Sequence, residues 1–252
     1  MLAIETKDLK KEFEEFKLKP LNLKVQEGEI LGFLGPNGSG KTTVVRLLTG
    51  QYTPTSGTAN VLGVDVTQHP VQVRSLVGII PEQENPPSFL TVREYLHFIC
   101  KVRKLEDAKG RVNRWLKFLF FESQKDLLIK DLSRGTKQKL LVAQAFIHEP
   151  KLVFIDEPLI NLDPVIQSRL KDFLVHYAQA GNTVFLSTHV LDGGLVEVLP
   201  ELLGVMEQLV DVAKARGDSD AFREQRELRE LRDQLLVALG DRRRLEPGAG
   251  AP

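Results

Sequence analysis

Short apolar runs alternate with longer helical patterns through residues 1–192. Four runs rich in apolar and β-branched residues are bounded by turn or polar residues, which predicts buried parallel strands with both faces covered. These runs are Ile30–Leu34, Leu76–Ile80, Leu152–Ile155 and Thr183–Ser187. Segments with a helical period predict helices at Thr43–Leu48, Val92–Val102, Lys137–His148 and Val165–Ala180. The alternation of strands and helices predicts an α/β domain.

The pattern changes after Asp192. Residues 193–252 hold 1 lysine and 8 arginines, whereas residues 1–192 hold 17 lysines and 8 arginines. The tail has helical periodicity over Leu195–Ala215 and Asp220–Leu239, with Ser219 as a candidate N-cap of the second helix. The last residues, 246–252, are rich in glycine, alanine and proline, which is typical of disorder. We therefore expect a helical tail of unusual composition after the α/β domain.

Composition narrows the function classes. The chain has 34 Lys+Arg and 34 Asp+Glu, a formal net charge of zero, so it lacks the basic footprint of a nucleic-acid-binding protein. Its single cysteine, Cys100, excludes an intramolecular disulfide and favours a reducing, intracellular setting. The N-terminus has no apolar stretch typical of a secretory signal, and no apolar run approaches the roughly 18 residues of a membrane span. We expect a cytoplasmic protein.

The strongest motif follows the strand Ile30–Leu34 and precedes a helix. It reads Gly35-Pro36-Asn37-Gly38-Ser39-Gly40-Lys41-Thr42-Thr43 and fits the phosphate-binding pattern G-x-x-x-x-G-K-[ST]. The glycines allow the backbone to curl so that its N–H groups face phosphate oxygens, and the following helix adds its positive dipole end. We expect Lys41 to reach the β- and γ-phosphates, Thr42 to bind Mg²⁺ and Thr43 to donate to the α-phosphate.

A second motif, Lys151-Leu-Val-Phe-Ile-Asp156-Glu157-Pro158, ends an apolar strand with two carboxylates, Asp156 and Glu157. A buried parallel strand delivers its last residues to the carboxyl edge of the sheet, where ligands bind. We expect Asp156 to hold Mg²⁺ through water and Glu157 to orient or deprotonate an attacking water. Taken alone, the motif also fits a strand that ends in a solvated acidic turn.

Further residues complete a resemblance to one family. Leu132-Ser133-Arg134-Gly135-Thr136-Lys137-Gln138 resembles the signature loop of the ATP-binding subunits of ABC transporters, usually written LSGGQ. Asn161–Pro164 resembles the D-loop of that family, and Ser187-Thr188-His189 resembles its switch-histidine region. The ordered motifs cover residues 1–192. The resemblance implies a P-loop NTPase cassette with a mainly parallel sheet, flanking helices, an N-terminal antiparallel β part and a helical subdomain at about residues 84–140.

The resemblance also implies roles for individual residues. Two cassettes would enclose two ATP molecules, each held by the P-loop of one subunit and by Ser133 and Gly135 of the other, with the D-loop residue Asp163 also at this interface. Glu157 and His189 would act in hydrolysis. Arg134 stands where the usual signature has glycine, a variant found among exporter-like members.

Two assignments stay open. Phe13 stands in the place of the aromatic residue that stacks on adenine, and Phe16 is its competitor, with a core packing role as the alternative for Phe13. The γ-phosphate-sensing glutamine of the family falls at Glu82 by alignment, but the glutamine here is Gln83, and either could serve. After His189, the two further strands of the family do not occur in residues 193–252, which suggests a fused or rearranged C-terminus.

We therefore expect an ATPase subunit that binds ATP and Mg²⁺, pairs with a second cassette and drives a separate membrane permease, with no nucleic-acid partner. The permease would hold it at the inner face of the membrane. Two alternatives remain, a soluble ABC ATPase outside transport and a nucleotide-binding but inactive interaction protein. The first is disfavoured by the single cassette, and the second by the intact Lys41, Asp156, Glu157 and His189.

Overall fold

A computed structural model describes residues 1–82, 85–156 and 162–188. The candidate residues Gln83, Glu157 and His189 lie outside these ranges, as does the tail at 193–252. The strands are β1 (Leu2–Glu12), β2 (Lys17–Leu21), β3 (Lys24–Gln26), β4 (Ile30–Leu34), β5 (Ser56–Val61), β6 (Val64–Asp65), β7 (Val77–Ile80), β8 (Leu152–Asp156) and β9 (Thr183–Thr188). The helices are α1 (Lys41–Leu48), α2 (Pro70–Leu76), α3 (Val92–Val102), α4 (Ala108–Phe118), the 3-10 helix η1 (Ile129–Asp131), α5 (Arg134–Phe146) and α6 (Pro164–Gln179).

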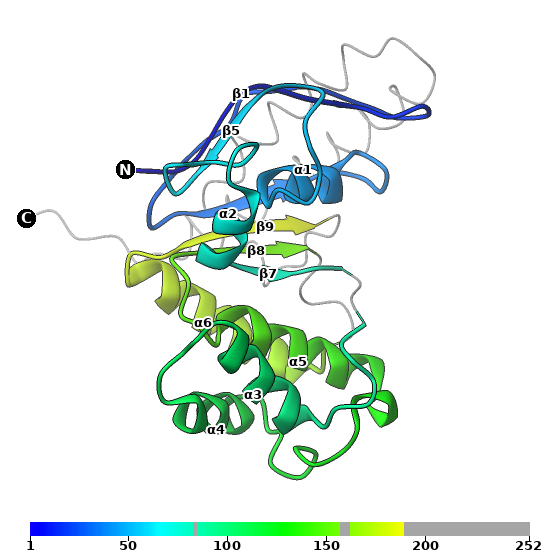
Figure 1. Ribbon diagram of the computed structural model, residues 1–252, viewed down its shortest axis with the longest axis vertical. Helices are drawn as coiled ribbons and strands as arrows, with labels where there is room; N and C mark the ends of the chain where they lie inside the picture. Colours follow the sequence, from blue (N-terminus) through cyan, green and yellow to red (C-terminus); the bar gives the residue numbers. More distant parts are fainter. Residues whose placement is uncertain (83–84, 157–161, 189–252) are drawn as a thin grey trace, which may run out of the picture.

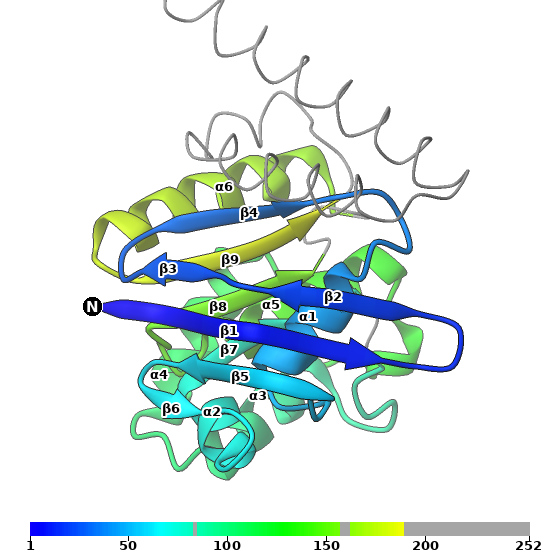
Figure 2. The ribbon, with the colours of Figure 1, turned by 90° about the horizontal axis from the view of Figure 1, so that it is seen from above.

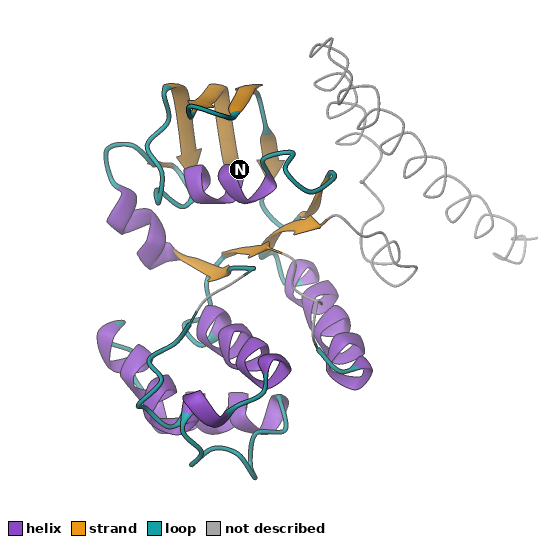
Figure 3. Cartoon of the chain, turned by 90° about the vertical axis from the view of Figure 1, so that its right-hand side faces the viewer, coloured by secondary structure: helices purple, strands orange, loops and turns teal. Residues whose placement is uncertain are grey.

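The described strands form two sheets. One is parallel, with the order β4-β9-β8-β7, and the other is antiparallel, with the order β2-β1-β5-β6 and β3 paired to β1. Helix α1 lies between the two sheets, and α3, α4, α5 and α6 lie on the other side of the parallel sheet (Figures 1 and 3). Figure 2 shows the long strand β1 crossing above α1 and the parallel strands.

The parallel strands are buried because their two faces supply two different hydrophobic cores. Along β8, Leu152 and Phe154 pack in the core between the sheets and α1, whereas Val153 and Ile155 pack in the core formed with the helices. The alternation follows from the two-residue period of a strand. A strand with this environment is apolar on both faces, which explains the continuous apolar runs in the sequence.

The predicted elements occur with small shifts at their ends. Helix α3 has the predicted bounds, and β4 coincides with the predicted strand. The sequence pattern predicts a strand that begins at Leu76, but Leu76 is the last residue of α2, so β7 begins at Val77. Helix α5 begins at Arg134 rather than Lys137, because the Ser133 side chain caps it by accepting a hydrogen bond from the Thr136 N–H.

An aromatic cluster joins the helices below the parallel sheet. Trp115 of α4 stacks on Phe146 of α5 with ring centroids 5.8 Å apart, and Phe173 of α6 lies edge-on to Phe146 at 4.9 Å. Arg169 of α6 donates a hydrogen bond to the Phe118 carbonyl at 3.0 Å. These contacts tie α6, which follows directly after the D-loop-like residues, to α4 and α5. In the part of the chain that the structure describes, no helix is long and apolar enough to span a lipid bilayer.

Candidate active site

Several predicted site residues meet at the carboxyl edge of the parallel sheet. The loop after β4, the end of β8 and the residues after β7 border one cavity of about 410 Å³. Its lining consists of Phe16, Asn37, Gly38, Gly40, Lys41, Thr42, Thr43, Glu82 and Asp156. A cavity at this edge is the usual ligand site of an open α/β sheet.

The backbone of the loop after β4 needs glycine at two places. Gly38 and Gly40 have φ angles of 83° and 96°, in the left-handed region that favours glycine. A Cβ at Gly40 would lie 2.7 Å from Cζ of Phe16, whereas a Cβ at Gly38 would meet no atom within 4 Å. The Gly38 backbone therefore faces open space, where a ligand can approach it closely.

The loop also presents polar groups to a ligand. Helix α1 begins at this cavity with no side-chain cap and no acidic residue in its first turn, so its positive end is available to an anion. The Ser39 Oγ of the same loop is buried and has no hydrogen-bond partner among the described residues, although Ser39 is not among the residues that line the cavity. An anionic ligand such as a phosphate chain fits this loop.

Lys41 is the cation of the site. It is only 6% exposed, and its Nζ donates hydrogen bonds to the carbonyls of Gly35 at 2.6 Å and Pro36 at 3.0 Å. These contacts hold the ammonium group over the loop. A buried ammonium among backbone carbonyls is suited to binding phosphate oxygens.

Asp156 supplies the carboxylate of the site. It ends β8, is 2% exposed and lines the cavity. Ser187, its neighbour in register on β9, donates a hydrogen bond to Asp156 Oδ1. This bond fixes the orientation of a carboxylate that the cavity reaches.

Two pairs of residues, Phe13 with Phe16 and Glu82 with Gln83, compete for one role each. Phe16 lines the cavity and contacts Gly40, whereas Phe13 is 37% exposed and lines a separate shallow hollow. The Phe13 ring lies edge-on to Tyr52, with centroids 5.6 Å apart. Glu82 lines the cavity, while its alternative Gln83 lies outside the described residues.

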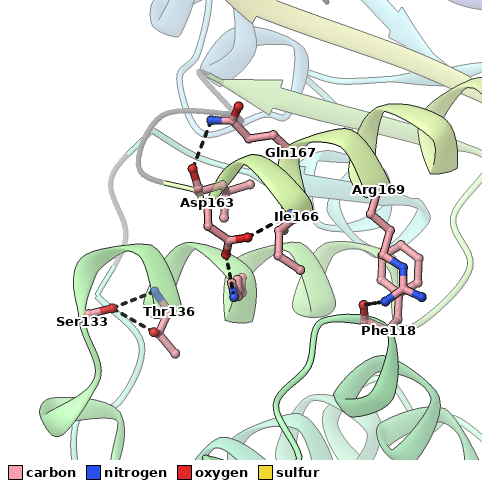
Figure 4. A network of polar contacts seen from close by, with 9 residues as sticks. Phe118, Ser133, Thr136, Asp163, Ile166, Gln167 and Arg169 are labelled. Atoms are coloured by element: carbon pink, nitrogen blue, oxygen red, sulfur yellow. Dashed lines mark hydrogen bonds and ion pairs between the residues drawn. The ribbon is translucent and has the colours of Figure 1, made fainter.

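The signature and D-loop residues Ser133, Gly135 and Asp163 do not line this cavity. Ser133 caps α5, Gly135 lies within its first turn, and Asp163 caps α6 (Figure 4). Lys139 Nζ lies 2.9 Å from Asp163 Oδ2, and this hydrogen bond is the main reason that the pKa of Asp163 lies below its ordinary value. The P-loop, Asp156 and Glu82 therefore meet at one cavity, whereas the signature residues of the same chain lie at the start of α5 and do not line it.

A comparison with protein families identifies the cassette. The family model described as ABC transporter matches residues 18–160, which include the P-loop, the signature residues and Asp156. The chain belongs to the ABC transporter family. It is an ATP-binding subunit of that family, an ABC-type ATPase, as the sequence resemblance implies.

Similarity to individual proteins supports the assignment of the chain to this family. The Nod factor export ATP-binding protein I of Cupriavidus metallidurans is 36% identical over 232 residues, covering 85% of this chain and 74% of that protein. The bacitracin transport ATP-binding protein BcrA of Enterococcus faecalis is 35% identical over 208 residues, covering 82% of this chain and 67% of the relative. A solved ATP-binding subunit of an ABC transporter superposes with a TM-score of 0.70 at 29% identity, covering 75% of this chain and 80% of its own.

Sequence reasoning did not single out two residues that the structure places in important contacts. The sequence places Ser187 in the switch-histidine region, and the structure shows that its hydroxyl also holds Asp156. A polar residue at the carboxyl end of a buried strand was the available signal. The pairing of Lys139 with Asp163 joins elements that are separated in the sequence, so no local pattern predicts it.

Proposed function

We propose that this ABC ATPase is the energy-coupling subunit of an exporter, and that it hydrolyses ATP to drive a separate membrane permease. The observation that carries the proposal is the cavity in which Lys41, Thr42 and Asp156 meet at the open N-terminus of α1. The names of two relatives, one in Nod factor export and the other in bacitracin transport, support an exporter. Because these two substrates differ, the names indicate no particular substrate for this chain.

ATP would enter with its phosphates on the loop after β4. Lys41 would exchange its contacts with the Gly35 and Pro36 carbonyls for oxygens of the β- and γ-phosphates. The loop amides and the first turn of α1 would donate to the remaining phosphate oxygens. The base would then lie toward Phe16, because this ring borders the cavity beside Gly40.

The residues present fit a magnesium ion. Asp156 and Thr42 line the same cavity, and oxygen atoms are the ligands that Mg²⁺ prefers. Since Ser187 engages Asp156 Oδ1, the carboxylate is held in one orientation. Phosphate oxygens and water would complete the coordination, because Mg²⁺ is usually bound by one or two carboxylates together with substrate phosphates and water. The ion would neutralise charge on the transferred phosphoryl group.

Hydrolysis would use the residues that directly follow the two central strands. Glu157 comes after Asp156 of β8, and His189 comes after Thr188 of β9. Because β8 and β9 are paired in register, we expect both residues to lie near the γ-phosphate. Glu157 would accept a proton from the attacking water, and His189 would align the water and contact the γ-phosphate.

A second cassette would complete the site. Ser133, Gly135 and Asp163 lie away from the P-loop cavity of their own chain, so they would act on ATP bound to a partner cassette. The Ser133 end of α5 suits this role, because a helix N-terminus attracts a γ-phosphate. The partner can be a second copy or a related chain. The permease would hold the pair at the inner face of the membrane.

A trapped dimer tests this arrangement. The variant Glu157→Gln keeps the shape of the side chain but cannot accept the proton, so it should accumulate an ATP-bound dimer with ATP and Mg²⁺. Light scattering after size-exclusion chromatography would measure the mass. The control is Glu157→Gln with Lys41→Ala, which should stay monomeric under the same conditions. A Glu157→Gln chain that stays monomeric with bound ATP would contradict the proposed homodimer, and addition of a related cassette would then test a heterodimer.

A further inference from the structure

Two cavities meet at the residues proposed to hold the metal. The P-loop cavity and a second cavity of about 480 Å³ share three residues with oxygen-bearing side chains, Thr42, Glu82 and Asp156. Asp156 ends β8, and Glu82 comes shortly after the neighbouring parallel strand β7. Both residues therefore reach the same edge of the sheet. Glu82 places a second carboxylate beside the two proposed magnesium ligands.

No neighbouring cation among the described residues neutralises Glu82. Its side chain is exposed and forms no ion pair or hydrogen bond with them. Arg46 lines the second cavity, but its guanidinium donates a hydrogen bond to the Tyr52 hydroxyl at 2.6 Å. The same guanidinium lies over the Tyr52 ring, 5.3 Å from its centroid. The Glu82 carboxylate can therefore turn toward a ligand without breaking a contact with the described part of the chain.

Negative charge exceeds positive charge on the wall of the P-loop cavity. Among the described residues that line it, Glu82 and Asp156 are acidic and Lys41 is basic. A metal-free triphosphate adds more negative charge, so both carboxylates repel it. A divalent cation reverses the sign of this effect, because the carboxylates attract the cation. The charge of the wall therefore favours a nucleotide that brings a metal ion.

We propose that Glu82 makes nucleotide binding depend on a divalent cation, so that the chain selects metal-bound ATP over metal-free ATP. An amide at this position would offer an oxygen to the metal without repelling the phosphates, whereas the carboxylate does both. The inference rests on the proposed function, in which Thr42 and Asp156 hold the metal at the phosphates. Because Glu82 is exposed, solvent screens its charge, and the expected effect is about tenfold.

Three variants of the full chain test the role of this charge. Glu82→Gln removes the charge and keeps the shape of the side chain and one oxygen. Glu82→Asp keeps the charge on a shorter side chain. Glu122→Gln is the matched control, because Glu122 is exposed and lines neither cavity. Since Glu82 makes no contact of this kind with the described residues, its substitution should leave the fold intact.

The first readout compares ATP binding with and without metal. Isothermal titration calorimetry would give the ATP dissociation constant with EDTA and with excess Mn²⁺, and the ratio of the two measures the dependence on metal. The ratio should be about tenfold smaller in Glu82→Gln, chiefly because metal-free ATP binds more tightly. Glu82→Asp should stay within about threefold of the unaltered chain, and Glu122→Gln should equal it. An unchanged ratio in Glu82→Gln, or an equal loss in Glu82→Asp, would overturn the proposal.

The second readout is the affinity of the ATP-loaded chain for Mn²⁺, measured by electron paramagnetic resonance. Linkage requires metal binding and ATP binding to strengthen each other by the same factor. Mn²⁺ should therefore bind about tenfold more weakly to ATP-loaded Glu82→Gln than to the unaltered complex. Equal Mn²⁺ affinity in the two complexes would overturn the proposal.

Failure of the proposed function gives a different result. An unaltered chain that binds no ATP even with Mn²⁺ would refute the ATP site, and the role of Glu82 with it. A chain that binds ATP with Mn²⁺ but has the same ratio in Glu82→Gln would refute the role of Glu82 alone.

Discussion

Ser187 donates a hydrogen bond to Asp156 Oδ1 across the two central strands of the parallel sheet. The two residues are partners in the β8–β9 register, and their exposures are 0% and 2%. The bond joins the ends of the strands that lead into Glu157 and His189. A buried carboxylate held in this way presents a fixed oxygen to a ligand in the cavity.

Removal of this hydroxyl should weaken metal binding. In Ser187→Ala, Asp156 loses its fixed orientation, so we expect about 10- to 100-fold weaker binding of Mn²⁺ in the presence of ATP. Electron paramagnetic resonance on a Mn²⁺ titration would measure this. The control is Thr183→Val at the opposite end of β9, where the hydroxyl accepts a hydrogen bond from the Gly28 N–H. Equal Mn²⁺ affinity in Ser187→Ala and Thr183→Val would contradict a role of Ser187 in orienting Asp156.

Lys41→Ala should abolish ATP binding. The substitution removes the cation of the cavity together with its contacts to the Gly35 and Pro36 carbonyls. Isothermal titration calorimetry with ATP would measure the loss, and Lys151→Ala, at an exposed lysine just before β8, is the charge-matched control. ATP affinity in Lys41→Ala equal to that of the control would refute the assignment of the phosphate site.

The base-stacking residue can be tested by a pair of substitutions. Because Phe16 borders the cavity and Phe13 does not, Phe16→Ala should weaken ATP binding about tenfold, in the range of a lost base–aromatic stack. Phe13→Ala should change the affinity little. The reverse order of the two losses, measured by fluorescence titration with an ATP analogue, would assign the role to Phe13.

The sequence predicted the parallel strands and the P-loop well, because each is encoded locally. The apolar run Ile30–Leu34 and the glycines after it determine a strand and a phosphate-binding loop without reference to distant residues. The helical pattern predicts a start of α5 at Lys137, three residues late, because Ser133 acts both as a signature residue and as the N-cap of the helix.

Contacts between distant segments could not be predicted in the same way. The Lys139–Asp163 pair and the approach of Phe16 to Gly40 depend on the packing of whole elements. The strand order β4-β9-β8-β7 likewise follows from crossovers rather than from local pattern. In the antiparallel sheet, β1 is half exposed and irregular in register, so its apolar pattern is weaker than that of the buried parallel strands.

Protonation of His148 should destabilise the fold in mild acid. Burial lowers its pKa from 6.5 to about 4, with Arg103 and Arg111 acting in the same direction, while Nε2 lies 3.2 Å from the Val77 carbonyl. The folded chain therefore binds the proton more weakly than the unfolded chain, and the free energy of unfolding should decrease as pH falls from 6.5 to about 4. Urea unfolding of His148→Gln should show a shallower decrease over this window. The same slope in both proteins would exclude this contribution.

The central claim is that one cavity binds and hydrolyses ATP with Lys41, Asp156 and Glu157. Its most direct test is steady-state release of phosphate from ATP and Mg²⁺ by the purified chain, measured beside Glu157→Gln at equal ATP occupancy. The account predicts turnover in the unaltered chain that is lost in Glu157→Gln while ATP binding persists. Turnover that survives in Glu157→Gln would contradict the account, as would a chain that binds ATP but releases no phosphate even with a partner cassette and permease membranes present.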